Sequence, residues 1–124
     1  MEEAYIYDSI RSPRGKGKSD GSLHELTSVY LSSEILKAIR DRNQLDTSII
    51  DDVIWGNVTQ IGEQGGCLSR SAVLKAGYCQ STPGLSINRF CASGLESVNL
   101  AANQVKGGAG TVSYTHLRAH ETRR

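Results

Sequence analysis

The chain has 124 residues, of which 38% are apolar and 22% charged, with a formal net charge of +1. This length suits one modest domain, and no apolar run reaches the roughly 20 residues of a membrane span. The acidic start, Met1 to Glu3, is followed by no hydrophobic run, so no secretory signal is predicted. The near-balanced charge disfavours nucleic acid or a membrane as partner. Three cysteines in a chain without a signal fit a reducing cytosol, so a cytoplasmic location is expected.

Two elements are predicted in the first third of the chain. Residues 4–8 predict a strand, because a mostly apolar run is typical of a strand that is buried on both faces. A loop rich in Gly, Ser and charge follows. A helix is then predicted from about residue 26 to 42, where apolar residues recur on one face: Leu31, Ile35 and Ala38 or Ile39.

The middle of the chain predicts a strand, a helix and a further strand. The strand covers residues 53–58, after capping residues at 46–48. The helix runs from about residue 65 to 76, and Gly77 is expected to end it in the left-handed conformation. The next strand covers residues 85–88.

A last helix is predicted after Cys91 as far as about Lys106. Its expected apolar face contains Leu95, Val98, Ala102 and Val105. Strands that alternate with helices predict the α/β class and a mostly parallel sheet. Functional groups of such sheets lie at the carboxyl ends of the strands, which is where Cys91 falls.

Cys91 is the strongest candidate for chemistry in this sequence. A cysteine at a helix start lies beside free backbone N–H groups, which favour the thiolate over the thiol. A thiolate on a rigid helix start is a good nucleophile, although most buried cysteines are inert. Asn88 and Ser93 flank the cysteine and are expected to shape its turn, and Gly94 is expected to let the helix start pack closely.

Residues 88–96, Asn-Arg-Phe-Cys-Ala-Ser-Gly-Leu-Glu, resemble the nucleophile segment of the thiolases, the acetyl-CoA acyltransferases. Residues 10–15, 53–58 and 62–65 resemble further segments of this family in the same order, and the last is followed by Arg70 and Ala72 as in the family. The resemblance covers about residues 4–110.

This resemblance implies a five-layer α/β/α/β/α fold built from two similar halves, with the chain covering most of the first half. It implies acyl transfer between CoA thioesters through an acyl-Cys91 intermediate, with acyl-CoA and coenzyme A as partners and no separate cofactor. Thiolases are typically dimers or tetramers, so the parent protein is expected to be a homodimer or homotetramer. The family's activating His and second catalytic Cys come from the second half, so no turnover is expected of this chain alone.

The resemblance assigns residues 1–110 to a partial thiolase N-terminal domain and stops after Gly110. Residues 113–122 resemble a translated sequencing adapter, so residues 111–124 are expected to be a non-native tail. His116 and His120 in that tail have helical metal-ligand spacing but no third ligand, so no metal site is predicted. Two alternatives remain open, namely a ketoacyl-synthase-type condensing enzyme and a non-catalytic truncated chain.

Overall fold

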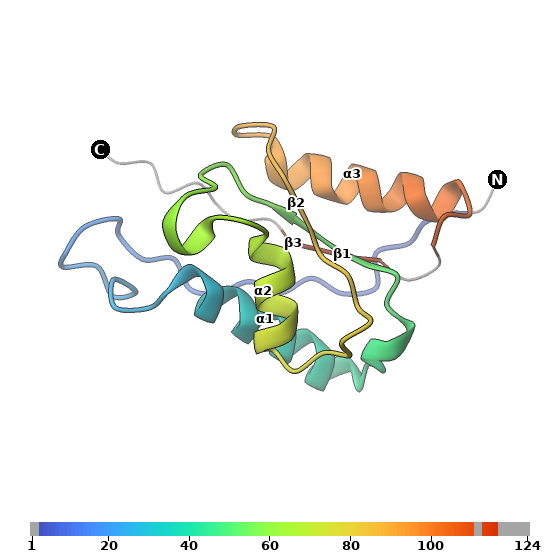
Figure 1. Cartoon of the computed structure of the whole chain (residues 1–124), viewed down its shortest axis with the longest axis horizontal. Helices are drawn as coiled ribbons and strands as arrows, with labels where there is room; N and C mark the ends of the chain where they lie inside the picture. The colour runs from blue at the N-terminus through green and yellow to red at the C-terminus, as the bar shows by residue number, and fades with distance from the viewer. Residues whose placement is uncertain (1–2, 111–112, 117–124) are drawn as a thin grey trace.

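The computed structural model describes residues 3–110 and 113–116, and these form three layers. A small parallel sheet lies between helix α3 on one face and helices α1 and α2 on the other (Figure 1). The elements follow one another as α1 (Ser28–Asn43), β1 (Asp52–Gly56), α2 (Leu68–Lys75), β2 (Leu85–Ile87), α3 (Ser93–Lys106) and β3 (Ser113–His116). Short 3-10 turns, η1 (Thr47–Ile49) and η2 (Gly62–Gln64), precede β1 and α2. The predicted α/β class is confirmed.

The described strands are all parallel and are ordered β2-β1-β3, so β1 is central. Its residue Ile54 pairs with Leu85 on one side and with Thr115 on the other. Val53, Ile54 and Trp55 are buried, as expected for a continuous apolar strand that is covered on both faces. Val53 and Trp55 join the core formed with α1 and α2, and strand alternation turns Ile54 toward α3.

Helices α1 and α2 begin and end close to the predicted positions. The Thr27 side chain caps α1 by accepting a hydrogen bond from the backbone N–H of Tyr30. Ile39, rather than the exposed Ala38, completes the buried face of α1. Gly77 has a φ of 74° directly after α2, which confirms the predicted left-handed end of this helix.

The predicted first strand is wrong. Residues 4–8 lie within the described part of the chain but form no strand, and the side chains of Tyr5, Ile6 and Tyr7 are exposed. This segment pairs with none of the three described strands. It is anchored to the end of α1 instead, where the Asp8 carboxylate accepts a 2.8 Å hydrogen bond from Asn43 Nδ2.

The predicted buried face of the last helix is also wrong. In α3, Leu95 is 61% exposed, whereas Gly94, Ser97 and Ala101 are buried. Small side chains face the sheet because the helix lies close to β1, so the bulkier leucine is turned outward. The buried face of this helix is therefore determined by the short distance to the sheet and not by the hydrophobicity of the side chains.

The described part of the predicted tail contains strand β3, which pairs in parallel with Asp52 to Trp55 of β1. The other residues predicted to be non-native, at 111–112 and 117–124, lie outside the described residues, and His120 is among them. Among the described residues, no helix combines the length and apolar character needed to cross a membrane.

Candidate active site

Cys91 lies in the turn between β2 and α3, and its side chain is exposed. Since β2 is parallel to its neighbours, the turn after it stands at the carboxyl edge of the sheet. The first helical residue of α3 is Ser93 and the N-cap residue is Ala92, so Cys91 is the residue just before the N-cap.

The residue before Cys91 has an unusual backbone conformation. Phe90 has a φ of 47°, a left-handed conformation that is uncommon for a residue other than glycine. The backbone N–H of Phe90 donates a 2.9 Å hydrogen bond to Asn88 Oδ1, and Asn88 Nδ2 donates to the carbonyl of Val58 at 3.3 Å. Asn88 therefore links the turn that carries Cys91 to the loop after β1.

Ser93 binds the same turn from its other side. Its hydroxyl accepts a 2.8 Å hydrogen bond from the backbone N–H of Arg89 and donates a 2.6 Å hydrogen bond to the carbonyl of Phe90. The backbone N–H of Ser93 also donates to the Phe90 carbonyl at 3.1 Å. Cys91 thus lies in a short loop closed by three hydrogen bonds to one buried residue.

An ion pair that sequence reasoning missed spans this turn. Arg89 Nε lies 3.1 Å from Glu96 Oε2, and Arg89 Nη2 donates to Glu96 Oε1 at 3.3 Å. Glu96 belongs to the first turn of α3, where a negative charge is favourable beside the helix N-terminus. The opposite charges on either side of Cys91 were the available sign of this pair in the sequence.

Gly94, the third residue predicted to support the turn, is buried in the first turn of α3. Facing it is Gly56, the last residue of β1, where an added Cβ atom would lie 2.7 Å from the Gly94 nitrogen. Sequence reasoning did not single out Gly56. A glycine at the end of an otherwise apolar strand was the sign of a close backbone approach there.

The other two cysteines belong to different segments. Cys67 precedes α2, and its thiol donates to the carbonyl of Gly84 at 3.3 Å. Cys79 lies between α2 and β2, with its sulfur 3.0 Å from the Ser81 hydroxyl oxygen. This hydrogen bond lowers the pKa of Cys79 below that of an ordinary thiol.

Comparison with known proteins identifies the family. A sequence profile described as "Thiolase, N-terminal domain" matches residues 4–114. Proteins named 3-ketoacyl-CoA thiolase from Shewanella denitrificans and Shewanella loihica are each 40% identical to this chain over 111 residues. Each of these matches covers 89% of this chain and 28% of the relative, so the chain spans about a quarter of the length of these curated relatives.

The profile match covers most of the chain and includes β1, β2, α3 and the Cys91 turn. The family predicted from residues 88–96 is therefore confirmed, and the chain belongs to the thiolase family, with the N-terminal domain as the part that it covers.

Proposed function

We propose that this chain is the nucleophile-bearing part of an enzyme that transfers acyl groups between CoA thioesters, with Cys91 as the nucleophile. The observation that carries the proposal is the exposed Cys91 in a hydrogen-bonded turn at the carboxyl edge of a parallel sheet. The names of the relatives, 3-ketoacyl-CoA thiolases, support thiolysis of a 3-oxoacyl-CoA as the reaction. Condensation of two acyl-CoA molecules is its reverse.

In the condensing direction, the Cys91 thiolate attacks the carbonyl carbon of an acyl-CoA. The new carbon–sulfur bond forms, the bond to the CoA sulfur breaks, and CoA leaves with the electron pair and takes up a proton. One thioester replaces another, so the step costs little in leaving-group ability. A second acyl-CoA, deprotonated beside its carbonyl, then attacks the acyl-cysteine and releases the thiolate.

Both attacks place negative charge on a carbonyl oxygen, which needs preorganised N–H donors. We assign one of these donors to the backbone N–H of Cys91. Asn88 and Ser93 hold the turn in shape through the hydrogen bonds described above. Gly94 lets the start of α3 lie close to the sheet.

The proposed parent protein has the five-layer thiolase fold and forms a homodimer or homotetramer. The activating His and the second acid/base cysteine belong to its other half, so the chain of 124 residues is proposed to have no turnover alone. Residues 111–124 are proposed to be foreign to that parent. No separate cofactor is required, because the CoA thioesters are the substrates.

A chimaera tests this proposal. Residues 4–110 would replace the matching segment of the Shewanella denitrificans 3-ketoacyl-CoA thiolase, and thiolysis of a 3-oxoacyl-CoA by CoA would be followed. The chimaera is expected to turn over, and C91S is expected to lower kcat by about 1,000-fold or more, because the weaker serine nucleophile lacks a base suited to it. Mass spectrometry of the quenched chimaera should show the acyl group on Cys91.

The C91A variant of the same chimaera is the second control, since it removes the nucleophile with little change in volume. Turnover that survives in C91A, or an acyl group found on another residue, would show that Cys91 is not the nucleophile. A chimaera that is folded but inactive even with Cys91 present would contradict the proposed activity of this segment.

A further inference from the structure

The end of β1 touches the start of α3 more closely than a side chain would permit. A Cβ atom added to Gly56 would lie 2.6 Å from the carbonyl carbon of Ser93 and 2.7 Å from the nitrogen of Gly94. The optimal separation of non-bonded carbon atoms is about 3.5–4.0 Å. The atoms that it would meet are backbone, so no side-chain rotation can make room for it.

Along the rest of the contact between α3 and the sheet, small side chains allow the same close approach. The buried positions of the helix are Ser93, Gly94, Ser97 and Ala101, while Leu95 points outward. All four buried residues are small, and they recur at helical spacing along the side that faces β1. Gly56 thus lies under the first turn of a helix that is packed close to the sheet.

Hydrogen bonds connect that first turn directly to the loop that contains Cys91. Ser93, whose backbone is against Gly56, binds the N–H of Arg89 and the carbonyl of Phe90 through its hydroxyl. Its own N–H binds the Phe90 carbonyl as well. Arg89 and Phe90 immediately precede Cys91, so a displacement of Ser93 away from β1 carries the cysteine with it.

We propose that Gly56 is a positioning residue for Cys91, because its missing side chain sets how close the start of α3 lies to the sheet. This inference rests on the proposed role of Cys91 as nucleophile. A methyl group at residue 56 would move Ser93 by about 1 Å to restore normal contact distances. A misplacement of about 1 Å at a reacting group can cost about 100-fold in rate.

Gly84 offers a matched control at a different helix. A Cβ atom added to Gly84 would lie 2.6 Å from the backbone nitrogen of Arg70 and 2.8 Å from its Cα atom, in the first turn of α2. The crowding is as severe as at Gly56. The cysteine beside this contact is Cys67, whose thiol donates to the Gly84 carbonyl.

The test compares G56A and G84A in the full chain of 124 residues. The alkylation rates of the three cysteines by iodoacetamide would be followed by site-resolved mass spectrometry from pH 6 to 9, with Cys79 as internal reference. For G56A we expect the Cys91 rate at pH 7 to fall about tenfold against Cys79, because the displaced turn moves the Cys91 sulfur from its exposed position. The Cys67 rate should stay within about twofold. G84A should change the rate of Cys67 and leave that of Cys91.

A Cys91 rate in G56A within twofold of the unsubstituted chain would overturn the inference. Equal changes of Cys91 in G56A and G84A would overturn it too, because they would report general loosening. If circular dichroism shows that G56A is unfolded, S93A replaces it, since this change removes the two hydroxyl hydrogen bonds without any overlap. An unchanged Cys91 rate in a folded S93A would then refute the route from Gly56 to Cys91.

The chimaera separates this inference from the proposed function. There, G56A should lower kcat by about 100-fold with KM nearly unchanged, as expected when a reacting group is misplaced and binding is retained. A chimaera whose turnover depends on Cys91 but is unaffected by G56A would refute the positioning role alone. A chimaera without turnover would contradict the function, while the alkylation rates would still decide the role of Gly56.

Discussion

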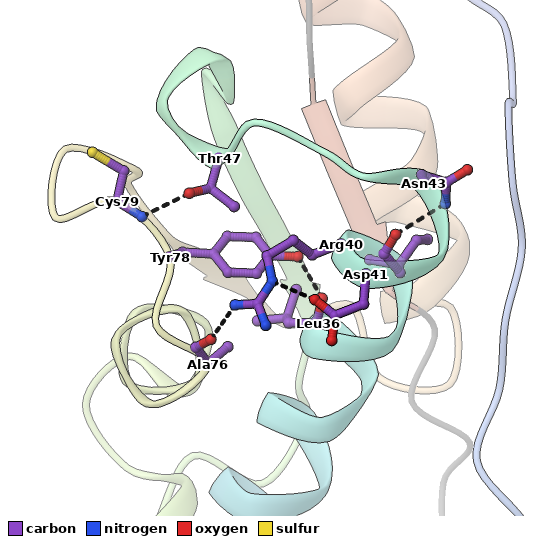
Figure 2. Close-up of polar contacts among 9 residues, drawn as sticks. Leu36, Arg40, Asp41, Asn43, Thr47, Ala76, Tyr78 and Cys79 are labelled. Carbon is purple, nitrogen blue, oxygen red and sulfur yellow. Dashed lines mark hydrogen bonds and ion pairs between the residues drawn. The ribbon is translucent and has the colours of Figure 1, made fainter.

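The hydroxyl of Tyr78 donates a 2.6 Å hydrogen bond to the backbone carbonyl of Leu36 (Figure 2). Both residues are buried, and the bond joins the segment after α2 to the middle of α1. Arg40 reinforces the junction, because its Nη1 donates to the Ala76 carbonyl at 2.6 Å and its guanidinium carbon lies 5.8 Å from the centre of the Tyr78 ring. This contact fixes the two helices on one face of the sheet.

Y78F is expected to lower the free energy of unfolding by about 1–2 kcal/mol, the range for losing a buried hydrogen bond. The ring and its packing remain, so the loss of stability measures the contribution of the hydroxyl group. Urea denaturation followed by circular dichroism measures it. Y7F is the matched control, since Tyr7 is 90% exposed, and it should change stability by less than about 0.5 kcal/mol. Equal stability of Y78F and the unsubstituted chain would contradict the contribution of this bond.

The stability of the fold should also depend on Tyr78 at high pH. Burial raises the pKa of Tyr78 from the ordinary 10.0 to about 12. Between these values the unfolded chain loses the phenolic proton and the folded chain keeps it. Stability due to Tyr78 is therefore complete below pH 10 and is lost as pH rises toward 12. Urea midpoints of the unsubstituted chain should fall more steeply between pH 10 and 11.5 than those of Y78F, and parallel curves would contradict this.

Cys79 is expected to be a second reactive thiol. The Ser81 hydroxyl lowers the pKa of Cys79 through its hydrogen bond, and alkylation proceeds through the thiolate. S81A should raise that pKa and lower the Cys79 alkylation rate at pH 7 by about threefold. The rate at Cys67 should be unchanged. A Cys79 rate that does not respond to S81A would show that the hydroxyl does not stabilise the thiolate.

Arg70 is expected to stabilise the connection that leads into β2. Its Nη2 donates to the Gln80 carbonyl at 2.9 Å, and its Nη1 donates to the Thr82 carbonyl. Lysine keeps the charge but cannot bridge two carbonyls with a planar fork. R70K should lower the free energy of unfolding by about 1–2 kcal/mol, as measured by urea denaturation. R14K, in an exposed loop, should have almost no effect. A loss of equal size in both variants would point to a general effect of the substitution.

The local sequence was enough to predict those features that depend on only a few neighbouring residues. Residues 53–58 predicted a strand, and β1 forms there, from Asp52 to Gly56. Gly77 predicted the left-handed end of α2, because glycine adopts a positive φ without a steric penalty. The segment around Cys91, together with the segments at 10–15, 53–58 and 62–65, predicted the family, which the profile match confirms.

Two local patterns failed because composition and periodicity do not fix tertiary contacts. Residues 4–8 have the composition of a strand, but a strand also needs a hydrogen-bonded partner, and these residues pair with none of β1, β2 and β3. In α3 the side chain of Leu95 is turned outward, since the helix lies too close to the sheet for a leucine on its inner side.

For the candidate site, the sequence alone identified the candidate nucleophile and placed it between a strand and a helix. This was possible because the local spacing of apolar residues indicates where a strand ends and a helix begins. Only the tertiary structure decided the surroundings of Cys91. The approach of Gly56 to Ser93 joins residues that are far apart in the sequence. This contact depends on how close β1 and α3 pack, and packing distance is a property of the assembled layers that no single segment encodes.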